Sequence, residues 1–211
     1  MSEVERTYLP AAGRDWALPF YDPFVKLLGG DSARRALLDQ ARLGPGHFVL
    51  DIGCGTGTLA VLLKRIHPGV EVVGIDPDPK ALARARRKAE RAASIRFDQA
   101  FSDSLPYPEA SFDRVFSSFM FHHLPADEKE KTLREVRRVL KPGGSLHLLD
   151  FAGAELSRNG FLRLFHSSHR LSDNSEERIL ALLRQAGFTD GQKLADRTLF
   201  FIIRIAYFRA A

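Results

Sequence analysis

A glycine-rich turn between a predicted strand and a predicted helix constrains the fold of this 211-residue chain more than any other feature. Residues 47–53 (HFVLDIG) form an apolar run typical of a buried strand, and residues 58–67 carry apolar side chains at helical spacing. Between them, Gly53, Gly55 and Gly57 allow a tight turn and the close approach of a ligand. The first N–H groups of the helix can then face an anionic group. The segment therefore predicts a nucleotide-type site at one edge of a parallel sheet.

The rest of the chain continues this alternation of strands and helices. Further strands are expected at residues 70–76, 94–99, 111–118 and 146–151, and further helices at residues 78–93, 125–140 and 174–187. Two β segments, 188–196 and 198–207, close the chain with a turn near Asp196, so one of them runs antiparallel to the rest. We therefore predict an α/β fold: a Rossmann-like, doubly wound, mainly parallel sheet of seven strands with an antiparallel strand near the C-terminus.

Two segments fall outside this alternation. Residues 1–40 are expected to form an N-terminal helical cap, and residues 41–211 the main domain, with a cap insertion at residues 153–174. Both caps would cover the carboxyl edge of the sheet, where open α/β sheets bind ligands. The aromatic residues in these segments that are candidates to line a pocket are Trp16, Phe20, Tyr21, Phe161 and Phe165.

Composition excludes several classes of protein. A single cysteine, Cys54, rules out a disulfide framework and a multi-cysteine zinc site, and it fits a reducing cytosol. The first ten residues lack the apolar run of a signal peptide, and the most apolar stretch, 199–208, is too short to span a membrane. The net charge of +5 includes a basic run at residues 81–92, which we interpret as a solvated helix face, so no nucleic-acid partner is expected.

An acid at the end of the second predicted strand indicates the kind of nucleotide. The dinucleotide fingerprint has Gly or Ala at the sixth position counted from Gly53, and this chain has Thr58 there. Asp76 lies 19 residues after Gly57, where an acid binds both ribose hydroxyls and repels a 2′-phosphate. The alternative is that Asp76 is a helix-entry acid beside the better cap Asp78. Adenosine with a charged tail other than pyrophosphate fits this pattern.

Longer stretches of the chain resemble a known family. The segments VLDIGCGTG, VVGIDPDP, LPYPEASFDRVFSSFMFHHL and LREVRRVLKPGGSLHLLDF are similar to the class I S-adenosylmethionine (SAM)-dependent methyltransferases. The subgroup that they resemble acts on small molecules and includes the quinone-biosynthesis C-methyltransferases. The resemblance covers about residues 45–152 closely and 175–211 loosely. It implies SAM as the cofactor, a methyltransferase domain over residues 41–211, and in-line methyl transfer to an O, S, N or activated C atom of a small acceptor.

The resemblance also places one set of residues around SAM. These residues are Asp51, Gly53, Cys54, Gly55, Gly57, Asp76, Pro77, Phe101, Ser117 and Ser118. The glycines would contact the methionine part, Asp76 the ribose and Pro77 the adenine, and the two serines would face the cofactor. Asp51 would order the turn, although it also fits a simple loop cap. Cys54 is most simply a small residue in a tight turn, because no basic neighbour activates its thiol.

One position departs from the pattern of the family. Relatives usually carry Gly-Asp-Ala before the Leu-Pro-Phe-Pro element, with that Asp contacting the adenine amino group. Here the aligned residues are Ala100, Phe101 and Ser102, so the acid is missing. Phe101 is then expected to cover the adenine face, with Asp98 or Asp103 binding the amino group.

Methyl transfer from a sulfonium requires the acceptor atom at about 3–3.5 Å, in line with the leaving sulfur and away from water. His122 and His123 follow the fourth strand at the sheet edge, where an imidazole can take the acceptor's proton. We rank His123 first as the base and His122 second, with Asp150 at the end of the fifth strand as a further candidate. The alternative is that one imidazole only packs and binds a backbone carbonyl. Tyr21 is a candidate to hold the sulfonium cation against its ring.

The remaining features bear on partners. No metal site is expected, because His166 and His169 have no third ligand close in sequence. The Asp/Asn-Pro-Pro-Tyr element of methyltransferases that act on DNA bases or on protein glutamine does not follow the fourth strand, which favours a small acceptor, aromatic or lipophilic. Two alternatives are a cofactor-binding partner subunit without catalysis and a nicotinamide-dependent oxidoreductase. The oligomeric state stays open, and we expect a cytoplasmic protein.

Overall fold

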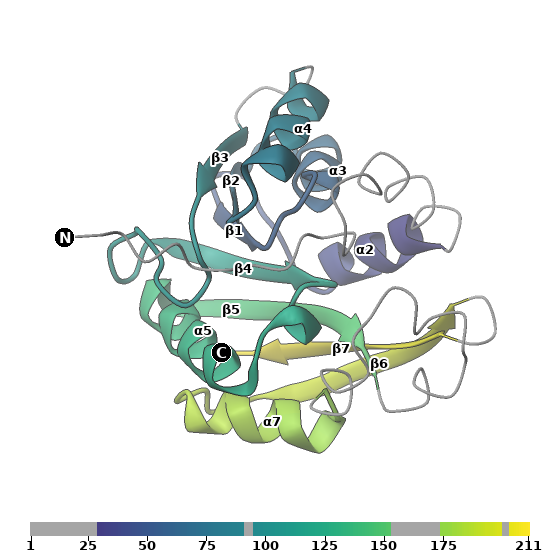
Figure 1. The fold of residues 1–211 in the computed structure, drawn as a ribbon, viewed down its shortest axis with the longest axis vertical. Helices are drawn as coiled ribbons and strands as arrows, with labels where there is room; N and C mark the ends of the chain where they lie inside the picture. Colours follow the sequence, from purple (N-terminus) through teal and green to yellow (C-terminus); the bar gives the residue numbers. More distant parts are fainter. Residues whose placement is uncertain (1–28, 91–94, 153–173, 200–202) are drawn as a thin grey trace.

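The computed structural model describes residues 29–90, 95–152, 174–199 and 203–211, and within them the strands form one sheet (Figure 1). The seven strands are β1 (Phe48–Ile52), β2 (Glu71–Asp76), β3 (Ile95–Gln99), β4 (Phe112–Ser118), β5 (Leu140–Phe151), β6 (Gln192–Leu199) and β7 (Ile203–Ala210). Their order is β3-β2-β1-β4-β5-β7-β6. Strands β1 to β5 pair in parallel, whereas β7 pairs antiparallel with both β5 and β6. The predicted mainly parallel sheet is therefore confirmed.

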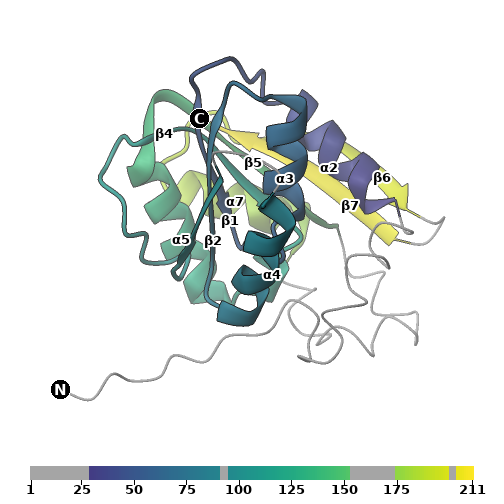
Figure 2. The same cartoon turned by 90° about the horizontal axis from the view of Figure 1, so that it is seen from above.

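Helices cover both faces of this sheet (Figure 2). One face carries α2 (Gly30–Asp39), α3 (Thr58–Ile66) and α4 (Pro79–Ala89), and the other carries α5 (Ala126–Val139) and α7 (Glu176–Gln185). Each face encloses its own apolar core, so the central strands β1, β2, β4 and β5 are largely buried on both sides, whereas the edge strand β6 is mostly exposed. A short 3-10 turn, η2 (Phe121–His123), follows β4 at the carboxyl edge of the sheet.

Local chemistry explains where two of the helices begin. Asp78 caps α4 by accepting a hydrogen bond from the Lys80 N–H at 2.8 Å, and Pro79 occupies the first helical position. Ser175 caps α7 by accepting a hydrogen bond from the Arg178 N–H at 3.3 Å. Both helices therefore start where the sequence predicts.

Two boundaries differ from the prediction, and strand pairing explains both. The strand expected at residues 146–151 begins earlier, because β5 starts at Leu140 directly after α5 and residues 141–144 are its first part. A register shift opposite Phe112 and Arg114 accommodates the extra residues as a bulge. The reversal between the last two strands is not near Asp196, because Asp196 pairs with Ala206 inside the β6–β7 ladder.

The predicted caps fall mostly outside the described residues. Residues 1–28 and 153–173 lie outside them, and with these segments Trp16, Phe20, Tyr21, Phe161, Phe165, His166 and His169. The described part of the N-terminal segment is α2, which packs on the face of the sheet, where the Tyr207 hydroxyl donates to the Ala33 carbonyl at 3.3 Å. A cap over the carboxyl edge of the sheet stays a prediction.

Candidate functional site

The carboxyl ends of β1, β2, β4 and β5 meet at the edge where the strand order changes direction, between β1 and β4. Crevices of this kind are where open α/β sheets bind ligands. The loop that leaves β1 there has left-handed backbone at all three predicted glycines, with φ of +64° at Gly53, +52° at Gly55 and +74° at Gly57. A side chain at Gly57 would lie 2.9 Å from the Ala85 side chain, so α4 also requires glycine there. Gly57 is the N-cap of α3 and offers no side-chain cap to that helix.

Asp76, at the end of β2, holds this loop in place. One of its carboxylate oxygens accepts a hydrogen bond from the Gly55 N–H at 2.9 Å, and the other accepts one from the Asp78 N–H at 2.9 Å. Burial raises the pKa of Asp76 to about 6, against the two backbone hydrogen bonds, which lower it. Each carboxylate oxygen has a second lone pair, so Asp76 can fix the loop and still accept hydrogen bonds from a diol.

Asp51, at the end of β1, is a buried carboxylate that can accept a further hydrogen bond. Burial raises its pKa to about 7, Arg34 lowers it and Asp76 raises it further, so the group stands between its two charge states near neutral pH. Its Oδ2 atom has no hydrogen-bond partner among the described residues, although the side chain is 1% exposed. A buried carboxylate oxygen of this kind fits a ligand that brings a cation.

Arg34 is a site residue that the sequence reasoning missed. It lies on α2 with its side chain 7% exposed, pairs with Asp31 at 3.7 Å, and places its guanidinium 5.4 Å from the centre of the Phe119 ring. The sequence pattern that could have found it is helical spacing, because Arg34 lies on the buried face of α2 together with Leu37 and Leu38. A buried cation that pairs with Asp31 and acts on Asp51 makes Arg34 a candidate to bind an anionic ligand group.

The end of β4 brings two hydroxyl groups to the same edge. Ser117 is fully buried, and among the described residues neither its hydroxyl nor that of Ser118 has a hydrogen-bond partner. Successive side chains on a strand point to opposite faces of the sheet, so the two hydroxyls lie on different faces. That both serines face the cofactor stays a prediction.

Several residues of the expected adenine-binding region make contacts with one another. The Gln99 side chain donates to the Pro77 carbonyl at 3.0 Å, which links the segments that follow β2 and β3. Asp98 accepts hydrogen bonds from the Tyr107 hydroxyl at 2.7 Å and from Arg96 at 2.9 Å through one oxygen, so it is already engaged away from the loop. Phe101 lies two residues after the end of β3 and is half-buried, and its contact with the adenine stays a prediction.

Cys54 lies inside the glycine-rich loop. Its backbone N–H donates to the Ile75 carbonyl at 2.8 Å, which ties the loop to β2. Burial raises the pKa of the thiol well above its usual value, and the nearby carboxylates of Asp51 and Asp76 raise it further. A thiol held protonated is a poor nucleophile, in agreement with a packing role.

A buried carboxylate–imidazole pair lies where η2, after β4, meets the end of β5. The Asp150 side chain, fully buried at the end of β5, lies 2.6 Å from the Nδ1 atom of His122. It also accepts hydrogen bonds from the backbone N–H groups of His122 at 2.9 Å and of Phe151 at 2.7 Å. When the neutral imidazole donates from Nδ1 to this carboxylate, Nε2 is the nitrogen that can accept a proton.

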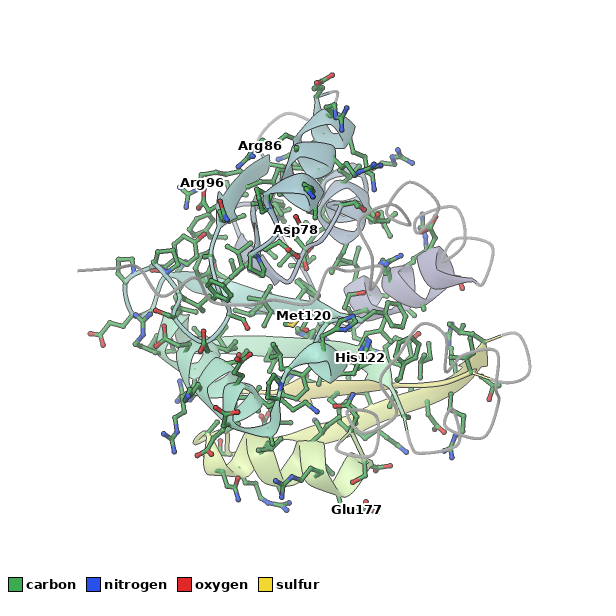
Figure 3. All side chains as sticks on the ribbon, viewed as in Figure 1. Asp78, Arg86, Arg96, Met120, His122 and Glu177 are labelled. Carbon is green, nitrogen blue, oxygen red and sulfur yellow. The ribbon has the colours of Figure 1, made fainter. Side chains whose placement is uncertain are left out.

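Aromatic rings surround this pair. The His122 ring lies 4.0 Å from the His123 ring and meets Phe151 edge-on at 4.8 Å, and Phe119 lies 5.3 Å from Phe151. Figure 3 shows His122 and Met120 near the centre of the molecule. Asp150 therefore orients His122, whereas His123 stands first when the sequence alone is considered.

Together, the sheet order, the glycine-rich loop and its acids define a Rossmann-like domain that binds a nucleotide-type ligand at its carboxyl edge. Residues 49–144 match a family model described as a methyltransferase domain. A demethylmenaquinone methyltransferase of Thermus thermophilus is 44% identical over 137 residues, which are 63% of this chain and 61% of that protein. The demethylmenaquinone methyltransferase of Deinococcus radiodurans is 42% identical over 137 residues, or 63% of this chain and 56% of that protein.

Solved structures agree in fold. The YcgJ protein of Bacillus subtilis matches with a TM-score of 0.73 at 22% identity, over 85% of this chain and 97% of that one. The resemblance to the class I SAM-dependent methyltransferases is confirmed by these matches. The chain spans a little over half the length of the two demethylmenaquinone methyltransferases. Among the residues described, each helix is too short or too polar to cross a bilayer.

Proposed function

We propose that this protein transfers the methyl group of SAM to a small aromatic acceptor that carries an acidic hydroxyl group or ring carbon. The observation that supports SAM best is the pair of buried acids at the ends of β1 and β2, beside the glycine-rich loop. Asp51 has an unpartnered oxygen within the described structure, and Asp76 keeps acceptor capacity beside the loop it holds. The two sites fit the ammonium group and the ribose diol of an adenosyl amino acid.

Different residues of the chain would bind different parts of SAM. The methionine part would lie along the left-handed turn formed by Gly53, Gly55 and Gly57, as the resemblance implies, and Arg34, which acts on Asp51, would bind the carboxylate of that part. Pro77 and Phe101 flank the adenine, as the resemblance implies. When bound, SAM supplies an electrophilic methyl group on a sulfonium, which already carries the activation that the reaction needs.

His122 and Asp150 supply the remaining chemistry. Asp150 is a positioning residue, because it binds Nδ1 of His122 and the backbone of η2 and thereby turns Nε2 away from itself. His122 accepts the acceptor's proton at Nε2 as the new bond to the methyl carbon forms. The surrounding aromatic rings exclude water and favour a flat acceptor, which agrees with the quinone-related names of the relatives.

Cofactor binding is tested by titrating S-adenosylhomocysteine (SAH) calorimetrically into the wild type and the Asp76→Asn variant. Loss of charge-assisted hydrogen bonds to two hydroxyls, about 1.5–3 kcal/mol, weakens binding roughly 10- to 150-fold. Asp113→Asn is the matched control, because Asp113 also accepts a backbone hydrogen bond, from Phe48 at 2.8 Å, at the opposite edge of the sheet. Absence of SAH binding by the wild type would exclude the proposal.

Catalysis is tested with a panel of phenols, quinols and thiols, by measuring SAH release. We expect turnover with at least one hydroxylated aromatic compound, and a loss of kcat of about 10²–10⁴-fold in His122→Asn. The affinity of that variant for SAH stays within twofold of the wild type, because His122 lies outside the loop. Cofactor binding without turnover of any acceptor would instead indicate a silent partner subunit.

A further inference from the structure

Lys129 is a buried lysine that the proposed chemistry does not use. It lies on α5, on the buried face of the helix that also carries Leu133 and Val136. Burying an ammonium group is costly, and well-packed apolar side chains of similar volume at such positions are often neutral or stabilising. Stability alone therefore does not explain a lysine at this position.

The contacts of Lys129 reach both segments that meet at the carboxylate–imidazole pair, η2 and the end of β5. Its ammonium group donates to the side-chain oxygen of Asn174 at 2.8 Å, and each of the two residues is 1% exposed. The same ammonium lies 5.5 Å from the centre of the Phe121 ring, at the start of η2. The Asn174 amide group donates in turn to the Phe151 carbonyl, at the end of β5, through a long hydrogen bond of 3.5 Å.

The chemistry of the two side chains fixes the direction of this arrangement. A lysine ammonium can only donate hydrogen bonds, so it holds the oxygen of the Asn174 side chain toward itself. The NH₂ group of Asn174 is thereby directed to the Phe151 carbonyl. We call Lys129 and Asn174 together the lysine–asparagine bridge.

The residues that the bridge contacts are the direct neighbours of the pair. Phe121 precedes His122 in η2, and Phe151 follows Asp150 in β5. The Phe151 ring also meets the His122 ring edge-on at 4.8 Å. The bridge therefore connects η2 to the end of β5 at the place where the His122 Nδ1 atom lies 2.6 Å from Asp150.

We propose that Lys129 and Asn174 are positioning residues, which hold η2 against the end of β5 and so keep the His122 ring on Asp150. This inference rests on the proposed function, because it takes His122 to be the proton acceptor of the methyl transfer. Both residues act through His122 and take no part in proton transfer. Without the bridge η2 can shift relative to β5, and a misplacement of about 1 Å at a reacting group can lower the rate by about 100-fold.

The test follows the Nδ1 proton of His122 by NMR in the isotope-labelled protein, with no ligand added. A proton held by a buried carboxylate exchanges slowly with water, so it should give a resolved signal, which is assigned by its absence in His122→Asn. In Lys129→Met, which keeps an unbranched side chain but removes the charge and the donors, this proton should exchange at least tenfold faster. Thr132→Val is the matched control, because it removes a different buried hydrogen bond of α5, between Thr132 and Ser102 at 2.9 Å, and it should keep the wild-type exchange rate.

The catalytic consequence is measured by SAH release with the acceptor that the wild type turns over. The kcat of Lys129→Met should fall about 10- to 100-fold, because the imidazole is displaced from the acceptor's proton. The Kd for SAH should stay within twofold of the wild type, because the bridge contacts η2 and β5 and not the glycine-rich loop.

The outcomes separate the inference from the function on which it rests. Absence of the signal in the wild type, an unchanged exchange rate in Lys129→Met, or an equal acceleration in Thr132→Val would overturn the positioning role. Faster exchange in Lys129→Met, in a protein that turns over no acceptor, would support the hold on His122 and reject the proposed function. Should Lys129→Met not fold, as judged by its thermal transition, Asn174→Ser breaks both contacts of the amide group and carries the same comparison.

Discussion

Cofactor binding is expected to depend on pH between 6 and 8, because the loop acids must lose protons when a cation binds. In the free protein burial raises the pKa of Asp51 to about 7 and that of Asp76 to about 6. In the proposed complex the ammonium group beside Asp51 and the diol beside Asp76 would both favour the ionised carboxylates. The protonated fraction of each acid therefore weakens the apparent affinity for SAH.

The size of the effect follows from the two pKa values. Each acid weakens the apparent affinity by a factor of 1 + 10^(pKa − pH), which together gives about 1.1 at pH 8 and about 20 at pH 6. The apparent Kd for SAH should thus rise about 20-fold from pH 8 to pH 6, and about one proton should be released per SAH bound at pH 6.5.

Calorimetric titration checks both numbers, with the Kd measured across the pH range and the proton count measured in buffers of different ionisation enthalpy. In Asp51→Asn the pH dependence should shrink to about twofold, because only Asp76 still titrates. Asp113→Asn should keep the full dependence. A wild-type Kd that stays flat from pH 8 to pH 6 would refute the assignment of Asp51 to a cationic ligand group.

Three further predictions follow from the structure. Burial lowers the pKa of His147 to about 3. The contribution of the neutral imidazole to the free energy of unfolding is therefore complete above pH 6.5 and is lost as the pH falls. Urea unfolding should show that the wild type loses about 3 kcal/mol more stability than His147→Gln between pH 7 and pH 4. Gly57→Ala should lower stability by roughly 2–5 kcal/mol through left-handed backbone and a clash with α4, whereas Gly143→Ala, with φ of +77° and open space, should cost only about 1–2 kcal/mol in the same assay. Arg34→Met should weaken SAH binding about tenfold. It should also shift the pH dependence of binding to higher pH, because Arg34 lowers the pKa of Asp51. An unchanged pH midpoint in calorimetry would show that Arg34 and Asp51 do not interact.

Features carried by neighbouring residues were predictable from the sequence. The glycine-rich loop, the Asp78 cap with Pro79, and the acid at the end of β2 each depend on chemistry within a few positions of the chain. Backbone that requires glycine, a helix start that requires an acceptor, and alternating apolar runs leave their marks locally. The strand and helix order, and with it the parallel sheet, follows from the same local patterns.

Strand boundaries were less predictable, because pairing partners decide them. The start of β5 at Leu140 and the continuation of β6 past Asp196 depend on ladders formed with β4 and β7. No local signal at these positions distinguishes a turn from a bulged strand. Backbone hydrogen bonds to a neighbouring strand make the extended form the stable one.

The sequence alone determined the class of fold, the loop and the acids at the ends of β1 and β2. Only the tertiary structure decided which histidine meets Asp150, 28 residues further along the chain, and that Arg34 lies over the Phe119 ring and Met120 against Gly53. Contacts between residues far apart in sequence depend on how helices and strands pack, and packing is a property of the whole core. A residue's type therefore indicates what it can do, whereas its neighbours in space decide which residue does it.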